Sequence, residues 1–202
     1  TLSAVRDLVR HELKTSQPDK FPIGHTGTDI RDLLQSMFQK PNQKDISYEK
    51  CSDCNYEATS QIQSQSLIFI TCSSHKSTQS NFKHWQNQKK YCGLCTKKVC
   101  ITRYFTISPS FICFSLEVKK IISKYIKIEN QDKSTTRLSL KGIIYSGSNH
   151  FTSRFIVNNE IWYHDGISTG SKCIKEGHLD DFEGDLLFKC KKKEAVVVIY
   201  GV

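Results

Sequence analysis

The hydrophobic positions divide the chain into a helical start and a long remainder of strand-like runs. Residues 3 to 14 carry apolar side chains at helical spacing and predict a short amphipathic helix. A second helix is predicted to begin near Thr28 or Asp29, either of which can cap it, and to end before Pro41. The apolar positions are Val5, Leu8, Val9 and Leu13 in the first helix and Ile30, Leu33, Leu34, Met37 and Phe38 in the second.

From Cys51 onward, short apolar runs alternate with polar stretches, which is typical of strands. The predicted strands cover residues 65–72, 99–107, 111–118, 125–129, 137–146, 151–157, 161–164 and 195–200. The polar stretch 73–88 has no apolar period and is predicted to be a loop or a finger-like excursion. Helices followed by a β-rich remainder predict an α+β architecture.

Composition limits the class of protein. The chain has 202 residues, long enough for a sizeable core without disulfides. Its most apolar run, residues 195–200, is too short to span a membrane. The formal charge of +9 comes from lysines spread along the chain, which favours solubility and attraction to an acidic protein partner over a nucleic-acid surface. The chain begins at Thr1 without a signal peptide, so we interpret it as a fragment.

Four of the nine cysteines form two CxxC pairs, Cys51/Cys54 and Cys92/Cys95. Two residues between thiolates allow both to reach one tetrahedral ion, and two such pairs complete a closed structural zinc site. The alternatives are disulfides or unrelated buried cysteines. An odd cysteine count together with CxxC pairs points to a reducing, intracellular compartment, nuclear or cytoplasmic.

A histidine and an acid frame a predicted hairpin. His150 enters one strand and Asp165 closes the next, with a turn at Asn158–Asn159 between the strands. An acid in this position can orient an imidazole, so that one ring nitrogen stays protonated and the other can take a proton from a nucleophile. A histidine near a strand start is more often structural, and His164 is a competitor, but it is expected on the opposite face of its strand.

These residues resemble the ubiquitin-specific protease family of papain-like thiol isopeptidases. Its histidine box is similar to Gly147–Thr152 followed by Trp162–Asp165. Its helix before the fingers is matched loosely by Gly27–Leu34, and its strand motif after the second knuckle by Pro109–Leu116. The Asn-His-Phe form is closest to the SUMO isopeptidase branch. The resemblance covers about residues 25 to 202.

The resemblance implies a papain-like α+β fold with a helical thumb remnant (1–45), zinc-bearing fingers (46–108) and a β-rich palm (109–202). It implies that His150 acts as general base and then general acid, that Asp165 orients it, and that zinc bound by the four cysteines holds the fingers. The implied partners are ubiquitin or SUMO and the proteins they modify.

The sequence departs from the family pattern at three places. Asp165 stands one residue nearer the tryptophan than usual with Gly166 in place of a second acid, Thr28 replaces a glutamine, and the box with the nucleophilic cysteine is absent. No cysteine here is expected to open a helix, as the nucleophile of such sites does. The nucleophile is therefore expected upstream of Thr1 or lost, and the fragment alone is expected to be inactive. The alternatives are a catalytically inactive module that binds ubiquitin or SUMO, and a zinc-ribbon nucleic-acid binder.

Overall fold

The computed structural model describes residues 2–22, 29–37, 43–51, 53–64, 68–72, 77–105 and 108–202. The helices are α1 (Leu2–Ser16), α2 (Ile30–Met37), α3 (Thr78–Gln86) and α4 (Asp185–Phe188), with a 3-10 turn at Leu179–Asp181. The first strands are β1 (Gln43–Lys50), β2 (Glu57–Ser64), β3 (Ile68–Cys72), β4 (Asn87–Tyr91), β5 (Lys98–Phe105) and β6 (Phe111–Leu116). The later strands are β7 (Tyr125–Glu129), β8 (Thr135–Gly147), β9 (His150–Val157), β10 (Glu160–His164), β11 (Ile174–His178), β12 (Lys189–Cys190) and β13 (Lys193–Gly201).

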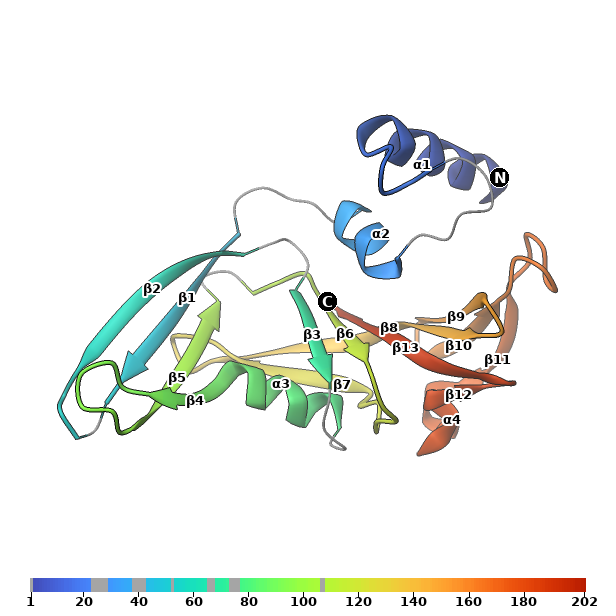
Figure 1. The fold of residues 1–202 in the computed structure, drawn as a ribbon. Helices are drawn as coiled ribbons and strands as arrows, with labels where there is room; N and C mark the ends of the chain where they lie inside the picture. The colour runs from blue at the N-terminus through green and yellow to red at the C-terminus, as the bar shows by residue number, and fades with distance from the viewer. Residues whose placement is uncertain are drawn as a thin grey trace.

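The strands form two sheets that extend in different directions (Figure 1). The finger sheet has the order β2-β1-β5-β4 and is antiparallel throughout. The palm sheet has the order β11-β10-β9-β8-β13-β6-β3, with β7 paired to β8 and β12 to β13. Its strands are antiparallel except for the β3–β6 pair. This sheet-rich mixture with a few helices agrees with the predicted α+β class. Residues 46–108 contribute to both sheets, because β3 lies in the palm sheet.

Helices lie on both faces of the palm sheet (Figure 1). On one face, Phe82 of α3 and Leu187 and Phe188 of α4 pack into the largest cluster of buried apolar side chains. On the other face, Leu34 of α2 packs against buried residues of β6 and β13. The palm strands alternate between these two clusters, as the two-residue period of a strand requires. Within the described residues, no helix has the length and apolar character to cross a membrane.

The polar stretch predicted to be a loop contains α3, so that prediction is wrong. The Ser77 side chain accepts a hydrogen bond from the Ser80 N–H and caps the helix at 3.2 Å. Phe82 is fully buried, and Thr78 lies 2.7 Å from the Tyr200 hydroxyl. Residues 73–76 lie outside the described residues. The apolar stripe of α3 is too narrow to show a helical period in the sequence. Contacts with distant strands, and not a broad apolar face, stabilise this helix.

Five strands, β1, β2, β4, β11 and β12, lie outside the predicted strands. Three of them form most of the finger sheet and have polar sequences, so an apolar alternation does not mark them. Backbone pairing defines them, for example Tyr48 opposite Thr59 in β2 and opposite Thr102 in β5.

The two predicted N-terminal helices are present. Asp29 caps α2, because its carboxylate accepts from the Arg31 N–H at 2.7 Å. Thr28, Phe38 and Pro41 lie outside the described residues, as does Gly27 of the helix motif. In α1, Leu13 is buried but Val5 and Leu8 are exposed, so only part of the predicted apolar stripe contacts the rest of the described chain.

Candidate active site and metal centre

Two tight turns place His150 and Asp165 at one end of the palm sheet. The turn at Ser148–Asn149 joins β8 to β9, and its positive φ angles of 53° and 56° suit a two-residue hairpin. The predicted turn at Asn158–Asn159 joins β9 to β10, with φ angles of 50° and 63°. His150 is therefore the first residue of β9, and Asp165 directly follows β10.

Strand register brings the two side chains together. His164 pairs with Ser153 across the β9–β10 ladder, so continuing the alternation puts Asp165 on the same face as His150. His150 Nε2 lies 2.7 Å from Asp165 Oδ1. An ionised carboxylate only accepts hydrogen bonds, so Nε2 carries the proton of the neutral ring. Nδ1 is then the unprotonated nitrogen, free to accept a proton from another group.

Several donors hold the Asp165 carboxylate. The Ile167 and Ser168 N–H groups donate to Oδ1 at 2.9 and 3.4 Å, and the Tyr163 hydroxyl donates to Oδ2 at 3.1 Å. The bond from His150, followed by those from Ile167 and Ser168, holds the pKa of Asp165 well below its usual range, against the opposing effect of burial. The carboxylate is therefore ionised at neutral pH.

This depressed pKa predicts an acid-sensitive contribution to stability. Because the folded pKa lies below the unfolded value of about 3.9, the stabilisation is present above that value and is lost as the pH falls toward the folded pKa. Urea unfolding of metal-free wild type and Asp165→Asn should show a wild-type advantage at pH 6 that shrinks as the pH falls below about 4. An advantage independent of pH would contradict it.

His164 lies on the other side of β10. Its Nε2 is 3.0 Å from the Gly170 carbonyl oxygen, within the turn that follows the strand. The two candidate histidines thus lie on opposite sides of β10. Of these two side chains, His150 is the one with a described contact to the Asp165 carboxylate.

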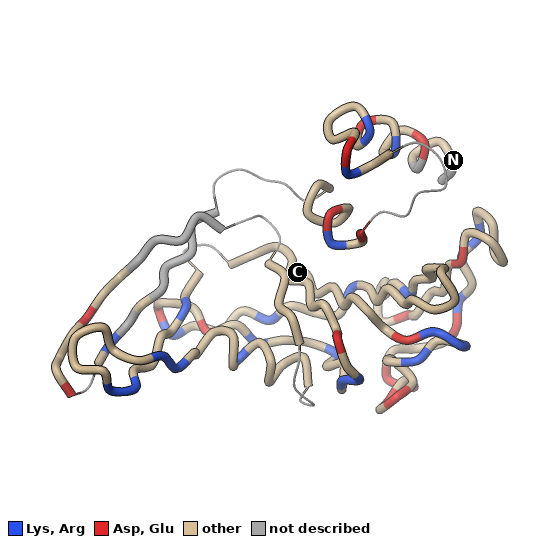
Figure 2. The backbone as a smooth tube through the Cα atoms, viewed as in Figure 1, with Lys and Arg blue, Asp and Glu red and all other residues tan. Residues whose placement is uncertain are grey.

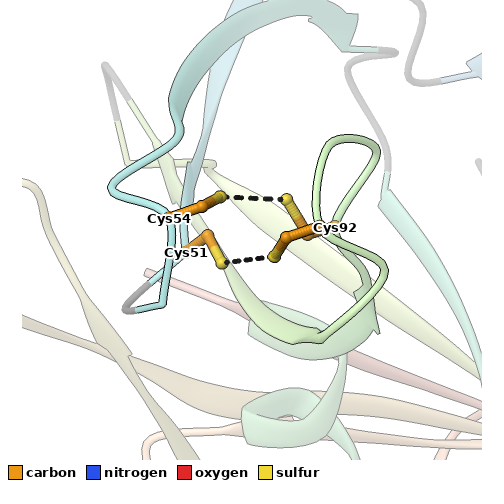
Figure 3. A group of neighbouring side chains, drawn as sticks. Cys51, Cys54 and Cys92 are labelled. Carbon is orange, nitrogen blue, oxygen red and sulfur yellow. Dashed lines mark hydrogen bonds between the residues drawn. The ribbon is translucent and has the colours of Figure 1, made fainter.

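The second cluster is formed by the four predicted cysteines, and its six sulfur pairs all lie within 4.8 Å. Cys51 comes from the end of β1 and Cys92 from the end of β4, and the knuckles face each other (Figure 3). The Cys51–Cys95 and Cys54–Cys92 sulfurs are 3.5 and 3.7 Å apart. A tetrahedral ion with bonds of about 2.3 Å separates its sulfur ligands by about 3.8 Å. The four thiols could therefore hold one metal ion.

Backbone N–H groups favour a thiolate at one cysteine of each knuckle. Those of Cys54 and Asp53 lower the pKa of Cys51, and those of Cys95 and Leu94 lower the pKa of Cys92 to about 7. Burial and the neighbouring thiols raise the pKa of Cys54 and Cys95. The knuckles are also joined by an ion pair between Lys97 and Asp53 at 2.7 Å.

The other five cysteines do not contact His150 among the described contacts. Cys72 is the last residue of β3 and does not open α3, which begins at Thr78 with its cap at Ser77. Cys72 lies in the core, where burial raises the pKa of its thiol to about 11. Burial raises the pKa of Cys113 to about 12 and also raises that of Cys190. Cys100 is exposed and Cys173 half-buried. All nine cysteines are free.

Basic residues are spread over the finger and palm sheets, with acidic residues among them (Figure 2). Several are paired with acids, including Lys50 with Glu57 at 2.5 Å and Lys124 with Asp180 at 3.1 Å. This distribution follows the scattered lysines of the sequence.

No protein-family model matches the chain, and no curated protein sequence is significantly similar to it. Solved structures show that its fold is similar to that of deubiquitinases. The SAGA deubiquitinase module of Ubp8, Sgf11, Sus1 and Sgf73 bound to monoubiquitin aligns over 79% of this chain and 40% of its own chain, with a TM-score of 0.55 and 14% identity. The yeast SAGA module with a variant Sgf73 aligns over 87% and 45%, with a TM-score of 0.52 and 12% identity.

A third SAGA module, with a truncated Sgf11, aligns over 79% of this chain and 40% of its own, with a TM-score of 0.50 and 13% identity. The chain thus spans less than half the length of these structures. At such identities the similarity concerns the fold.

The structure adds the Tyr163 hydroxyl to the surroundings of Asp165. The two-residue spacing between them on one strand face was the signal that could have revealed this contact.

Proposed function

We propose that this chain is the part of a thiol isopeptidase that bears the general base and the fingers, and that the isopeptidase removes ubiquitin or a related modifier from lysine side chains. The observation that carries the proposal is the 2.7 Å contact between His150 Nε2 and Asp165 Oδ1, which leaves Nδ1 as the proton acceptor. In this role His150 takes the proton of an attacking thiol and later gives it to the leaving amine. Asp165 holds the ring and stabilises the imidazolium.

The similarity to deubiquitinase modules, one of them bound to monoubiquitin, supports ubiquitin as the modifier. SUMO is the alternative modifier, from the Asn-His-Phe form of the histidine box. A division into thumb remnant (1–45), fingers (46–108) and palm (109–202) belongs to the same proposal. An intracellular location, nuclear or cytoplasmic, would suit both the substrate and the nine free thiols.

Zinc is the metal that we propose for the four-cysteine cluster. Its preference for tetrahedral thiolate sites fits the spacing of the four sulfur atoms and the two CxxC knuckles. Four protein ligands leave no open position for a reacting group, so the ion would have a structural role. Bound there, it would join β1 and β4 at the far end of the finger sheet.

Burial raises the pKa of the Cys72, Cys113 and Cys190 thiols, which makes them poor nucleophiles. We therefore expect the isolated chain to bind ubiquitin and to release no fluorophore from a C-terminal ubiquitin–fluorophore conjugate. Titrating ¹⁵N-labelled chain with ubiquitin, and separately with SUMO, measures binding. A conjugate assay on the same sample measures turnover.

His150→Ala should leave binding unchanged, with His164→Ala as the matched control. Absence of binding to both modifiers would contradict the proposed function. Turnover that His150→Ala abolishes would support the isopeptidase but show that a cysteine of this chain is the nucleophile. Binding that weakens steeply with salt for nucleic acid, and not for either modifier, would favour the nucleic-acid alternative.

A further inference from the structure

We propose that Tyr163 is a positioning residue, which holds the Asp165 carboxylate so that it faces His150, and that Lys191 strengthens this contact from above the tyrosine ring. The inference rests on the proposed function of His150 as a general base. It gives a role to Tyr163, which lies within the matched histidine box, and adds Lys191, which lies outside it.

The donors to Asp165 divide between its two oxygens. His150 Nε2 and the Ile167 N–H both approach Oδ1, at 2.7 and 2.9 Å. The Tyr163 hydroxyl approaches Oδ2 at 3.1 Å. A carboxylate held at one oxygen can rotate about its Cβ–Cγ bond, whereas donors at both oxygens hold its plane. Tyr163 therefore fixes the direction in which Oδ1 meets the imidazole.

Burial makes this contact necessary. Tyr163 is 2% exposed and Asp165 is 8% exposed, so water has little access to Oδ2. A buried charged oxygen that loses its donor carries a desolvation cost, which favours rotation of the carboxylate toward solvent. Such a rotation would carry Oδ1 away from His150 and release the proton on Nε2 to exchange between the two ring nitrogens.

Lys191 lies at the turn between β12 and β13, in a left-handed backbone conformation with φ of 55°. Its Nζ is 4.0 Å from the centroid of the Tyr163 ring. A cation over a phenol ring is attracted by the ring and draws electron density from it, so the hydroxyl becomes a stronger donor to Asp165. Interaction with the Tyr163 side chain is also the main reason that the pKa of Lys191 is raised.

The test removes one hydroxyl and keeps the ring. Tyr163→Phe is compared with Tyr200→Phe, which removes another buried tyrosine hydroxyl, one that donates to the Ser123 carbonyl at 2.7 Å. Long-range ¹H–¹⁵N spectra of the full chain report the tautomer of His150, and saturation transfer reports the exchange of its Hε2 proton with water. These readouts respond to the Asp165 contact and need no catalytic turnover.

We expect Tyr163→Phe to accelerate Hε2 exchange about tenfold, corresponding to about 1.4 kcal/mol, and to raise the population of the Nδ1–H tautomer. Tyr200→Phe should leave both near wild type. Unchanged exchange in Tyr163→Phe would overturn the proposal, and so would an equal change in Tyr200→Phe, which would indicate general loosening.

A second variant covers the case in which Tyr163→Phe does not fold. Lys191→Met keeps the side-chain stem and should accelerate Hε2 exchange about two- to threefold, as expected for an exposed cation–π contact. The neighbouring Lys192→Met is its control. Equal exchange in the two lysine variants would overturn the role of Lys191. Failure to bind ubiquitin would leave these spectra interpretable, so it tests only the proposed function.

Discussion

Replacing Cys92 with serine is expected to abolish metal binding and to open the finger sheet while the palm sheet remains folded. The four cysteines form the centre of the small buried cluster in the fingers, where Cys51, Cys92 and Val99 are the buried apolar members among the described residues. So small a core buries little apolar surface. At about 25 cal/mol per Å², this burial contributes too little free energy to offset the entropy lost in ordering four strands. Binding of a structural zinc ion contributes about 10–16 kcal/mol in small zinc domains.

Metal analysis and amide hydrogen exchange measure the two parts of this result. Wild type purified without chelator should contain about one zinc per chain, and Cys92→Ser none. Exchange should increase in β1, β4 and β5 and stay slow in β8 and β13, which lie in the middle of the palm sheet. Cys100→Ser is the matched control, because Cys100 is exposed on β5 and outside the cluster. Metal-free wild type, or a folded finger sheet in Cys92→Ser, would refute the structural metal.

Replacing Arg154 with methionine is expected to reduce the free energy of unfolding by about 2–3 kcal/mol, because it removes the hydrogen bonds of a buried charged side chain. Arg154 is 7% exposed, and its Nε donates to Glu176 of β11 at 2.5 Å. One terminal nitrogen, Nη1, donates to the Leu186 and Lys189 carbonyl oxygens at 2.6 and 3.1 Å. One side chain thus ties β9 to β11, α4 and the start of β12. Methionine fills similar volume but leaves Glu176 and both carbonyls without this donor.

Urea unfolding followed by amide exchange checks this expectation. Arg137→Met is the matched control, since Arg137 is exposed and its guanidinium lies 4.0 Å from the Tyr125 ring centroid at the surface. The control should cost no more than about 1 kcal/mol. Because Tyr163 pairs with Arg154 across the β9–β10 ladder, faster exchange in the Arg154 variant should reach β10 as well. An Arg154 variant as stable as the control would show that the hydrogen bonds and ion pair of Arg154 only offset the cost of burying its charge and add no net stability.

The sequence predicted most of the palm and little of the fingers, for a physical reason. Palm strands such as β8 and β13 bury apolar side chains, and their two-residue alternation or apolar runs show in the chain itself. Finger strands such as β4 are polar and depend on backbone pairing and on the cysteine cluster. Helix α3 was missed because its stability comes from distant partners. Gln86, for example, donates to the Arg103 and Glu129 carbonyl oxygens at 3.1 and 2.7 Å.

The sequence by itself determined which residues could meet. The spacing of two CxxC pairs and the position of His150 and Asp165 around one hairpin follow from local rules of knuckle and strand geometry. Only the tertiary structure decided which histidine nitrogen faces the acid, which neighbours hold the acid, and where each remaining thiol lies. Those outcomes depend on contacts between residues far apart in the chain, such as Lys191 over Tyr163 and Arg154 with Leu186. Such contacts arise when strands and turns pack together, and the local periodicity of the sequence does not predict them.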